Sequence, residues 1–244
     1  MAEVKTPDEI AILKRAAKAA KKVFVRTLPF IRAGNSEREI AEMMEGFAME
    51  IPGVSGLAYP AIIASGPNGA MPHAEITDRK IEAGDFVTVD FGVMLEGYAS
   101  DITRTFMVGE PDECQRKIYR SVLRSQKAGI ASAKAGMLCS ELDGVCRGLI
   151  ESDGYGEYFI HTTGHGVGKE VHEDPRIGKN SEGRLEAGMV VTIEPGIYIE
   201  GMGGVRIEDT VIITESGCEV ITKGISKAPD SLKRYQTFLN QKAN

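Results

Sequence analysis

The sequence of 244 residues has no tryptophan, four cysteines and four histidines. The cysteines form no CxxC pair and the sequence has no HExxH motif, which argues against a zinc finger or a helix-borne zinc protease. So few unpaired cysteines favour a reduced, cytoplasmic protein. Cys139 and Cys146 are seven residues apart in an expected helix, where we expect both to pack as small apolar residues.

Long apolar runs and basic clusters are also missing. No stretch reaches membrane-spanning length, and residues 1–6 have no apolar core of the kind that a signal peptide carries. The net charge of −6 gives no indication of nucleic-acid binding. The sequence therefore predicts a protein with no membrane or nucleic-acid partner, and we interpret a row of lysines in residues 14–22 as a solvated helix face.

One stretch occurs twice. Residues 82–97 read EAGDFVTVDFGVMLEG and residues 186–201 read EAGMVVTIEPGIYIEG, with eight of sixteen positions identical at an offset of 104. In both copies a β-branched run leads to a carboxylate, Asp90 in the first and Glu194 in the second. A second apolar run then opens with Asp101 or Glu208. A duplicated hairpin that repeats its acids indicates one site built from two halves.

The spacing predicts how the acids lie in each hairpin. Asp90 and Asp101 would be directly opposed, about 5 Å apart on one face, if the turn is centred between Leu95 and Glu96. Glu194 and Glu208 would be opposed around a turn at Gly201.

Opposed acids on a buried face repel each other and cost desolvation free energy, and a cation removes both costs. Four carboxylates suit two divalent ions better than one. The alternative is two solvated hairpins with acids on the wet face. That interpretation does not explain why the acids interrupt VTVDFG and VTIEPG, which otherwise look like core strands.

Helices and hairpins alternate in a regular order. Capping and apolar spacing predict helices over 6–28, 36–49, 111–136 and 140–154, a strand near 61–64, a hairpin over 85–108 and a short helix within the tail 225–244. Two helices followed by a hairpin, repeated once, predict an α+β protein. We expect two pseudo-symmetric halves, with antiparallel sheet and flanking helices, around a pseudo-two-fold axis.

Three of the four histidines lie in HTTGHGVGKEVHEDP, and the fourth, His73, lies in an expected loop. The Thr-Thr-Gly between His161 and His165 disfavours a helix, and in an extended chain the two would be roughly 13 Å apart, too far to share one metal ion. Gly164 and Gly166 allow a close backbone approach at His165, which we expect to be the metal ligand. His161 and His172 would then line the cleft.

Five motifs in order resemble a known family. PHAEITDRKIEAGDFVTVDFG, YASDITRTF, HTTGHGVGKEVHE, TIEPGIY and GGVRIEDT are similar to those of the pita-bread metallopeptidases, over about residues 4–225. This family includes methionine aminopeptidases, Xaa-Pro dipeptidases and aminopeptidases P. The resemblance implies the pita-bread (creatinase/aminopeptidase) fold. It also leads us to expect a single catalytic domain over residues 1–244, without the N-terminal domain that Xaa-Pro enzymes usually carry.

The resemblance also implies roles for individual residues. Two divalent ions, which could be Mn²⁺, Co²⁺, Fe²⁺ or Zn²⁺, would be held by Asp90, Asp101, His165, Glu194 and Glu208. Glu194 would accept and return a proton, His73 and His172 would bind the substrate and stabilise the intermediate, and His161 would support recognition of proline. Arg206, two residues before the last ligand, is typical of the Xaa-Pro group; it would orient carboxylates around the metal ions and contribute to the substrate site.

The implied activity is removal of the N-terminal residue from a peptide, with Xaa-Pro bonds preferred, by a hydroxide bound to two metal ions. The chain length is closer to that of a minimal methionine aminopeptidase, which keeps that enzyme as an alternative. Two further alternatives are a non-catalytic peptide-binding module and a creatinase-like C–N hydrolase, although such relatives usually lack the complete ligand set. The expected partner is a peptide, and the chain could act as a monomer or a homodimer.

Overall fold

The computed structural model describes residues 4–232 and 235. Its helices are α1 (Pro7–Thr27), α2 (Glu37–Met49), α3 (Glu113–Ser132) and α4 (Cys139–Ser152), with short 3-10 turns η1 (Leu28–Phe30), η2 (Gly66–Ala70) and η3 (Gly156–Tyr158). Helices α1, α2 and α3 begin with capping boxes. In each, the N-cap side chain accepts a hydrogen bond from the backbone N–H three residues later, and the acid or amide side chain of that later residue accepts one from the N-cap backbone N–H. These local signals explain why the helix starts were predictable.

The strands form four small antiparallel groups. The first half holds a sheet of β2 (Ile62–Ser65), β3 (Phe86–Phe91) and β6 (Ile102–Met107), and a sheet of β1 (Val54–Leu57), β4 (Val93–Leu95) and β5 (Tyr98–Ala99). The second half holds the pair β10 (Gly196–Ile199) and β11 (Gly203–Arg206). Its five-stranded sheet has the order β13 (Cys218–Val220), β12 (Asp209–Ile213), β9 (Val190–Ile193), β7 (Gly164–Gly166) and β8 (Glu173–Ile177).

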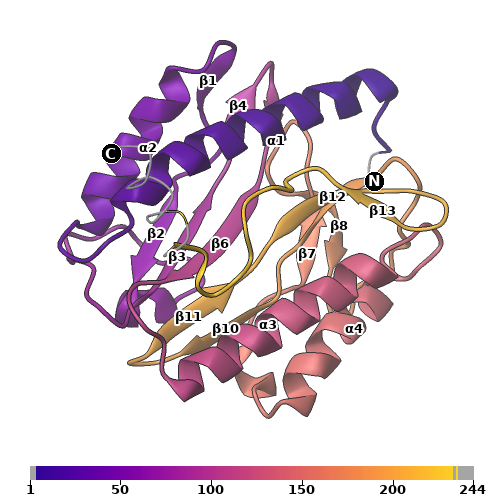
Figure 1. Cartoon of the computed structure of the whole chain (residues 1–244). Helices are drawn as coiled ribbons and strands as arrows, with labels where there is room; N and C mark the ends of the chain where they lie inside the picture. The colour runs from indigo at the N-terminus through magenta and orange to yellow at the C-terminus, as the bar shows by residue number, and fades with distance from the viewer. Residues whose placement is uncertain (1–3, 233–234, 236–244) are drawn as a thin grey trace.

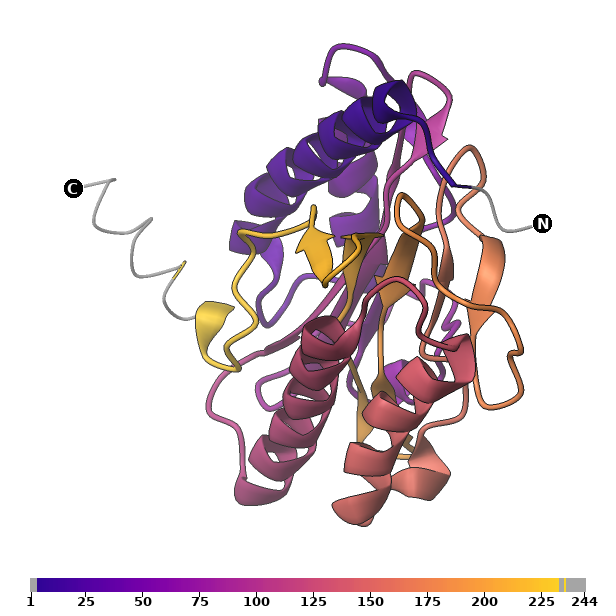
Figure 2. The same ribbon diagram turned by 90° about the vertical axis from the view of Figure 1, so that its right-hand side faces the viewer.

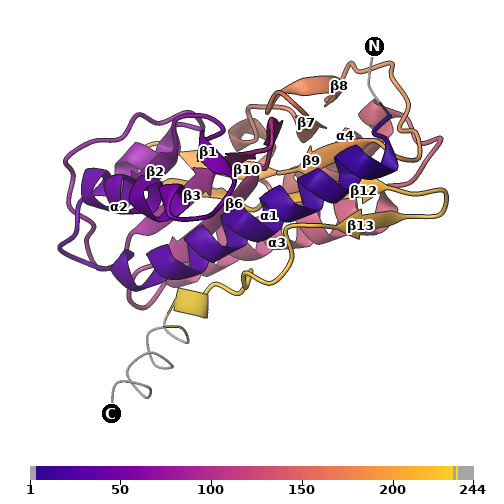
Figure 3. The ribbon, with the colours of Figure 1, turned by 90° about the horizontal axis from the view of Figure 1, so that it is seen from above.

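The two halves repeat each other, as the duplicated stretch predicts. An offset of 104 residues carries α1 and α2 nearly onto α3 and α4, and β3 nearly onto β9. Figure 1 shows α1 and α2 beside the strands of the first half, with α3 and α4 beside those of the second. In Figure 2 and Figure 3, α1 and α3 lie on the same side of the strands. The expected arrangement of two helices and a hairpin, repeated once, is confirmed.

Strand alternation separates core from site. In β3, Val87, Val89 and Phe91 belong to the core cluster that α1 and α2 cover, with the Phe91 ring 5.4 Å from that of Phe24. The residues between them, Thr88 and Asp90, face the other way, because successive side chains of a strand point to opposite faces. The acid therefore ends an apolar strand without entering the helix-covered core.

The second half repeats this alternation. Val191 and Ile193 of β9 lie in the core cluster covered by α3 and α4, and Thr192 points away from it to accept the backbone N–H of His165 at 3.0 Å. Glu194 follows on the same face as Thr192. The side chains of Asp90 and Glu194 therefore both lie on the strand face opposite the helix-covered core.

One predicted register is wrong and the other is confirmed. Asp90 faces Thr103 across β3 and β6, so Asp101 is a diagonal neighbour and not the directly opposed residue. The reason is a two-residue turn at Glu96 and Gly97, both with positive φ (51° and 79°), which fits the right-handed twist of the strands. A shift of two residues keeps the side-chain face, so both acids still point the same way.

In the second hairpin the turn is centred on Gly201, as expected. Ile199 pairs with Gly203 across the turn, and Ile193 pairs with Asp209. Glu194 and Glu208, which lie between these pairs, are therefore opposed.

Polar contacts join the halves along β6, β11 and β12. Thr105 Oγ1 donates to the carbonyl of Arg206 and accepts from its N–H, both at 3.0 Å. Thr210 Oγ1 donates to the carbonyl of Asp101 at 2.7 Å. Because buried polar groups must be paired, these bonds fix the position of one half against the other.

Other expectations have mixed outcomes. Cys139 and Cys146 are buried, free and part of the core of the second half, as expected. None of the described helices combines the length and apolar character needed to cross a lipid bilayer. The expected short helix in 225–244 falls largely on residues 233–234 and 236–244, outside the described part of the chain.

A buried ion-pair cluster supports the seam. Asp209, the first residue of β12, is fully buried and accepts from Arg104 at 2.8 Å, Thr222 at 2.9 Å and Gln126 at 3.0 Å, and also pairs with Lys227. Burial favours the neutral acid, but Arg104 and Lys227 outweigh it and hold the pKa of Asp209 below its usual value. The cluster ties β6 and α3 to β12.

We predict that Asp209→Ala lowers the free energy of unfolding by about 3–5 kcal/mol, because it leaves the Arg104 guanidinium buried without its carboxylate. Urea denaturation measures this change. Glu219→Gln is the matched control, since Glu219 pairs with Lys14 on the surface and its loss should cost at most about 1 kcal/mol. Equal losses in the two variants would contradict the prediction.

Candidate metal centre

One cavity of about 610 Å³ collects the predicted site. All nine residues singled out from the sequence line it: His73, Asp90, Asp101, His161, His165, His172, Glu194, Arg206 and Glu208. They come from both halves of the chain, and they lie in loops as well as in strands or next to strand ends. The cavity is also lined by Tyr59 and Arg176, which sequence reasoning missed.

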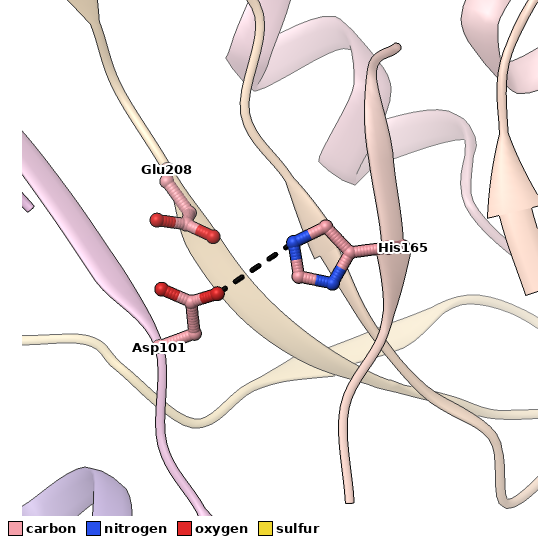
Figure 4. Close-up of side chains that lie close together, drawn as sticks. All are labelled: Asp101, His165 and Glu208. Atoms are coloured by element: carbon pink, nitrogen blue, oxygen red, sulfur yellow. Dashed lines mark ion pairs between the residues drawn. The ribbon is translucent and has the colours of Figure 1, made fainter. Parts of the chain in front are cut away.

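Three side chains offer ligand atoms to a common point. One donor atom each from Asp101, His165 and Glu208 lies within 4.8 Å of the other two (Figure 4). His165 Nε2 is 3.6 Å from Asp101 Oδ2 and 3.2 Å from Glu194 Oε1. Glu208 has an oxygen, Oε1, that is buried and has no hydrogen-bond partner among the described residues, while its Oε2 accepts from Thr103 at 2.7 Å.

Asp90, the remaining predicted ligand, lies beside this group and is held from two sides. Its Oδ2 accepts from Arg206 Nη2 at 2.5 Å, and its Oδ1 lies 2.6 Å from the hydroxyl of Tyr59. The same Tyr59 hydroxyl is 2.5 Å from Asp101 Oδ1. Tyr59 thus connects two of the predicted ligands, and burial beside Asp101 and Asp90 raises its pKa well above the usual value.

The acids strongly perturb one another. Burial, followed by the charges of Asp90 and Glu194, raises the pKa of Asp101 well above its usual range. Burial, followed by the charge of Asp101, does the same to the pKa of Glu208. Burial also opposes the charged form of Glu194, but the hydrogen bond from His165 outweighs it and lowers that pKa to about 2.

A divalent cation fits this donor set. It would relieve the repulsion among the acids and supply a partner for the orphaned Oε1 of Glu208. Four carboxylates with one imidazole are ligands of the kind that Mn²⁺, Fe²⁺, Co²⁺ and Zn²⁺ accept.

His165 is oriented for ligation. Its Nδ1 lies 3.0 Å from the carbonyl of Gly166, so the Nδ1–H donates there and Nε2 faces the acids. A Cβ on Gly164 would lie 2.1 Å from the carbonyl oxygen of Thr192, and one on Gly166 would lie 2.3 Å from that of Asp174. Only glycine permits this approach, as the flanking glycines predict. Burial lowers the pKa of His165, but Glu194 raises it more strongly, to about 9.

His161 is committed to a different network. Its Nδ1 donates to the carbonyl of Thr162 at 2.7 Å, and its Nε2 accepts from the Tyr198 hydroxyl at 2.8 Å. Tyr198 in turn accepts from Arg206 Nη1 at 2.7 Å. Burial lowers the pKa of His161 to about 4, so the ring is neutral near pH 7. With both nitrogens engaged, His161 lines the cavity without a free ring nitrogen.

His73 and His172 lie on loops at the border of the cavity, and both are exposed. The ring centroid of His172 is 4.3 Å from that of His165. Burial, followed by the charge of His165, lowers the pKa of His172. These two histidines are therefore placed to meet a ligand from solvent.

Comparisons with known proteins show that the chain is similar to peptidases. A model of metallopeptidase family M24 matches residues 11–215. The Xaa-Pro dipeptidase of Pyrococcus furiosus is 49% identical over 220 residues, which are 90% of this chain and 63% of the relative.

Solved structures agree with this similarity. The Xaa-Pro dipeptidase from Bacillus anthracis has a TM-score of 0.89 at 49% identity, covering 91% of this chain and 62% of that one. A variant of Escherichia coli aminopeptidase P has a TM-score of 0.90 at 28% identity, and the match covers 98% of this chain and 60% of that one. The expected pita-bread fold is confirmed, and the chain spans about 60–63% of the length of these relatives.

We predict that Mn²⁺ at 100 times its dissociation constant stabilises the protein by about 2.7 kcal/mol, seen as a rise in melting temperature that a chelator reverses. Glu208→Gln should weaken Mn²⁺ binding more than about 100-fold, since changes outside the ligand shell alone cost about 10–100-fold. Glu200→Gln, an exposed acid of the second hairpin, is the control and should bind normally. Titration calorimetry that shows equal affinities in both variants would exclude this site.

We also predict that Tyr59→Phe weakens Mn²⁺ binding by about 10–100-fold, because it removes the hydroxyl that connects Asp90 and Asp101. Tyr98→Phe is the matched control, because its hydroxyl donates to Glu9 at 2.8 Å, on α1. Calorimetric titration of both variants is the measurement. Unchanged affinity in Tyr59→Phe would show that the acids keep their positions without the tyrosine.

Proposed function

Because this chain belongs to metallopeptidase family M24, we propose that it is a metal-dependent exopeptidase that removes the N-terminal residue of peptides and prefers Xaa-Pro bonds. One observation carries the proposal: the nine predicted site residues line a single cavity in a chain 49% identical to an Xaa-Pro dipeptidase. We propose that the two halves act as one catalytic unit, in the cytoplasm, where the four cysteines would stay free.

The ligand set we propose is Asp90, Asp101, His165, Glu194 and Glu208, with two divalent ions, Mn²⁺ or Co²⁺ first. When bound, such ions lower the pKa of water and polarise a peptide carbonyl. The protein contributes fixed donors: Asp90 is held by Arg206 and Tyr59, and His165 by the Gly166 carbonyl. Bonds from these neighbours fix the donors before any ligand arrives.

Glu194 is our candidate for proton transfer. Asp101 and Glu208 are buried, whereas Glu194 is partly exposed, so its carboxylate can reach both a substrate and solvent. Thr192 Oγ1 donates to its Oε1 at 3.1 Å and fixes its orientation. A positioned carboxylate of this kind can take a proton from water and give one to the leaving nitrogen.

The histidines would bind the substrate. His73 and His172 approach from exposed loops, where either can donate a hydrogen bond to the peptide carbonyl or the leaving nitrogen. His161 has both nitrogens engaged, so it would present its ring edge to the proline ring. Arg206 donates hydrogen bonds to Asp90, to the Tyr198 hydroxyl and to the Pro72 carbonyl. It would therefore hold these three residues in position at the edge of the cavity.

A peptide panel tests the proposal. With Mn²⁺ or Co²⁺ added back after dialysis, we expect hydrolysis of Ala-Pro or Xaa-Pro peptides and little release of methionine from Met-Ala-Ser. Glu194→Gln should lower kcat about 10²–10⁴-fold through the lost proton transfer. Fast methionine release without Xaa-Pro cleavage would favour a methionine aminopeptidase. A folded, metal-loaded protein that cleaves nothing would point to a binding module.

A further inference from the structure

A buried acid outside the metal cavity receives an unusual number of hydrogen bonds. Glu37 is the first residue of α2, is fully buried, and is not among the residues that line the cavity. Five donors approach its two carboxylate oxygens at 2.7–3.0 Å. Burying a carboxylate costs desolvation free energy. The five hydrogen bonds to Glu37 offset that cost.

The donors come from both ends of one loop. Oε1 accepts from the N–H and the hydroxyl of Ser65, each at 2.7 Å. Oε2 accepts from Asn68 Nδ2 at 2.8 Å and from Thr77 through its N–H at 3.0 Å and its hydroxyl at 2.7 Å. One side chain of α2 therefore closes residues 65–77 into a loop.

This loop carries His73 and is held at two further points. The Pro72 carbonyl accepts from Arg206 Nη1 at 3.1 Å, which ties the residue before His73 to the site wall. The turn η2 packs directly on β11, where a Cβ on Gly204 would lie 2.2 Å from the carbonyl oxygen of Gly69. With both ends and the middle fixed, the path of the chain through His73 is determined.

The geometry of the donors requires an acid at this position. Arg79 donates to Ser65 Oγ at 2.8 Å and pairs with Asp85 at 2.5 Å, which places a cation beside the cluster. Glutamine has the same shape, but one of its two terminal atoms is an NH₂ donor. Since each carboxylate oxygen accepts from a backbone N–H, which can only donate, neither orientation of a glutamine amide can satisfy the loop.

We infer that Glu37 is a positioning residue that holds the 65–77 loop, and with it His73, over the metal cavity. The inference rests on the proposed function in one respect, the role of His73 in substrate binding. The hydrogen bonds by which Glu37 holds the loop do not depend on that role.

The main test compares Glu37→Gln in two backgrounds. In the otherwise unchanged, metal-loaded protein we expect kcat/KM on an Xaa-Pro peptide to fall about 100-fold, because small misplacements of a catalytic group cost about that much. Bound metal should be unchanged. In a His73→Ala background the same substitution should have no further effect, since the group that it misplaces is gone.

Glu39→Gln is the matched control. Glu39 lies two residues along the same helix, is exposed, and accepts from the Ser36 N–H as part of the helix cap, without touching the loop. Its loss should lower stability slightly and leave kcat/KM unchanged. An unchanged kcat/KM in Glu37→Gln, or an equal loss in both backgrounds, would overturn the positioning role.

Hydrogen exchange separates this inference from the proposed function. In Glu37→Gln, amides of residues 65–77 should exchange faster while those of β3 keep their protection; unchanged exchange in the loop overturns the anchoring. If the unsubstituted protein has no Xaa-Pro activity, the proposed function is wrong. Hydrogen exchange in Glu37→Gln then still tests whether Glu37 anchors the loop. Should Glu37→Gln not fold, Thr77→Val removes one of the five bonds without stranding the acid and should give smaller changes of the same kind.

Discussion

Repulsion among acids packed into one pocket is the constraint on which the rest of this structure depends. Burial opposes the charges of Asp101 and Glu208 and raises the pKa of both, and the neighbouring carboxylates of Asp90 and Glu194 add to that cost. The surrounding side chains are arranged as fixed donors that partly offset it, with Arg206 among them. One buried oxygen of Glu208 still has no partner within the described residues, which leaves a place for a cation to complete the site.

The duplicated architecture supplies the scaffold, and small departures from symmetry supply the site. Asp90 and Glu194 are equivalent at an offset of 104 residues, but the residue opposite Asp90 is Thr103 whereas the residue opposite Glu194 is Glu208. The second turn has one residue more than the first, so the counterpart of Glu208 in the first half is Thr103 and not Asp101. Thr103 consequently donates to Glu208 across the seam, where a strict repeat would have set two acids together.

Several features of the site could not be predicted because their partners are far apart in sequence. Tyr59 lies in a loop with no motif around it, and only the fold brings its hydroxyl to Asp90 and Asp101. The Arg206–Tyr198–His161 network likewise depends on how β10 and β11 face the histidine loop. The error in the predicted position of the first turn has a local cause. Glu96 has a positive φ, which is uncommon for a residue other than glycine, so its sequence did not indicate that it belongs to the turn.

By itself the sequence determined the four helices, the two repeated hairpins and nine residues that gather at one cavity. Capping boxes, strand periodicity and repeated motifs act over a few residues, and they place Asp90 and Glu194 at strand ends on the face away from the helices. Only the tertiary structure decided which atoms meet. The seam between the halves and the loop anchors at Glu37 and Arg206 arise from contacts between residues more than twenty positions apart, which no local pattern encodes.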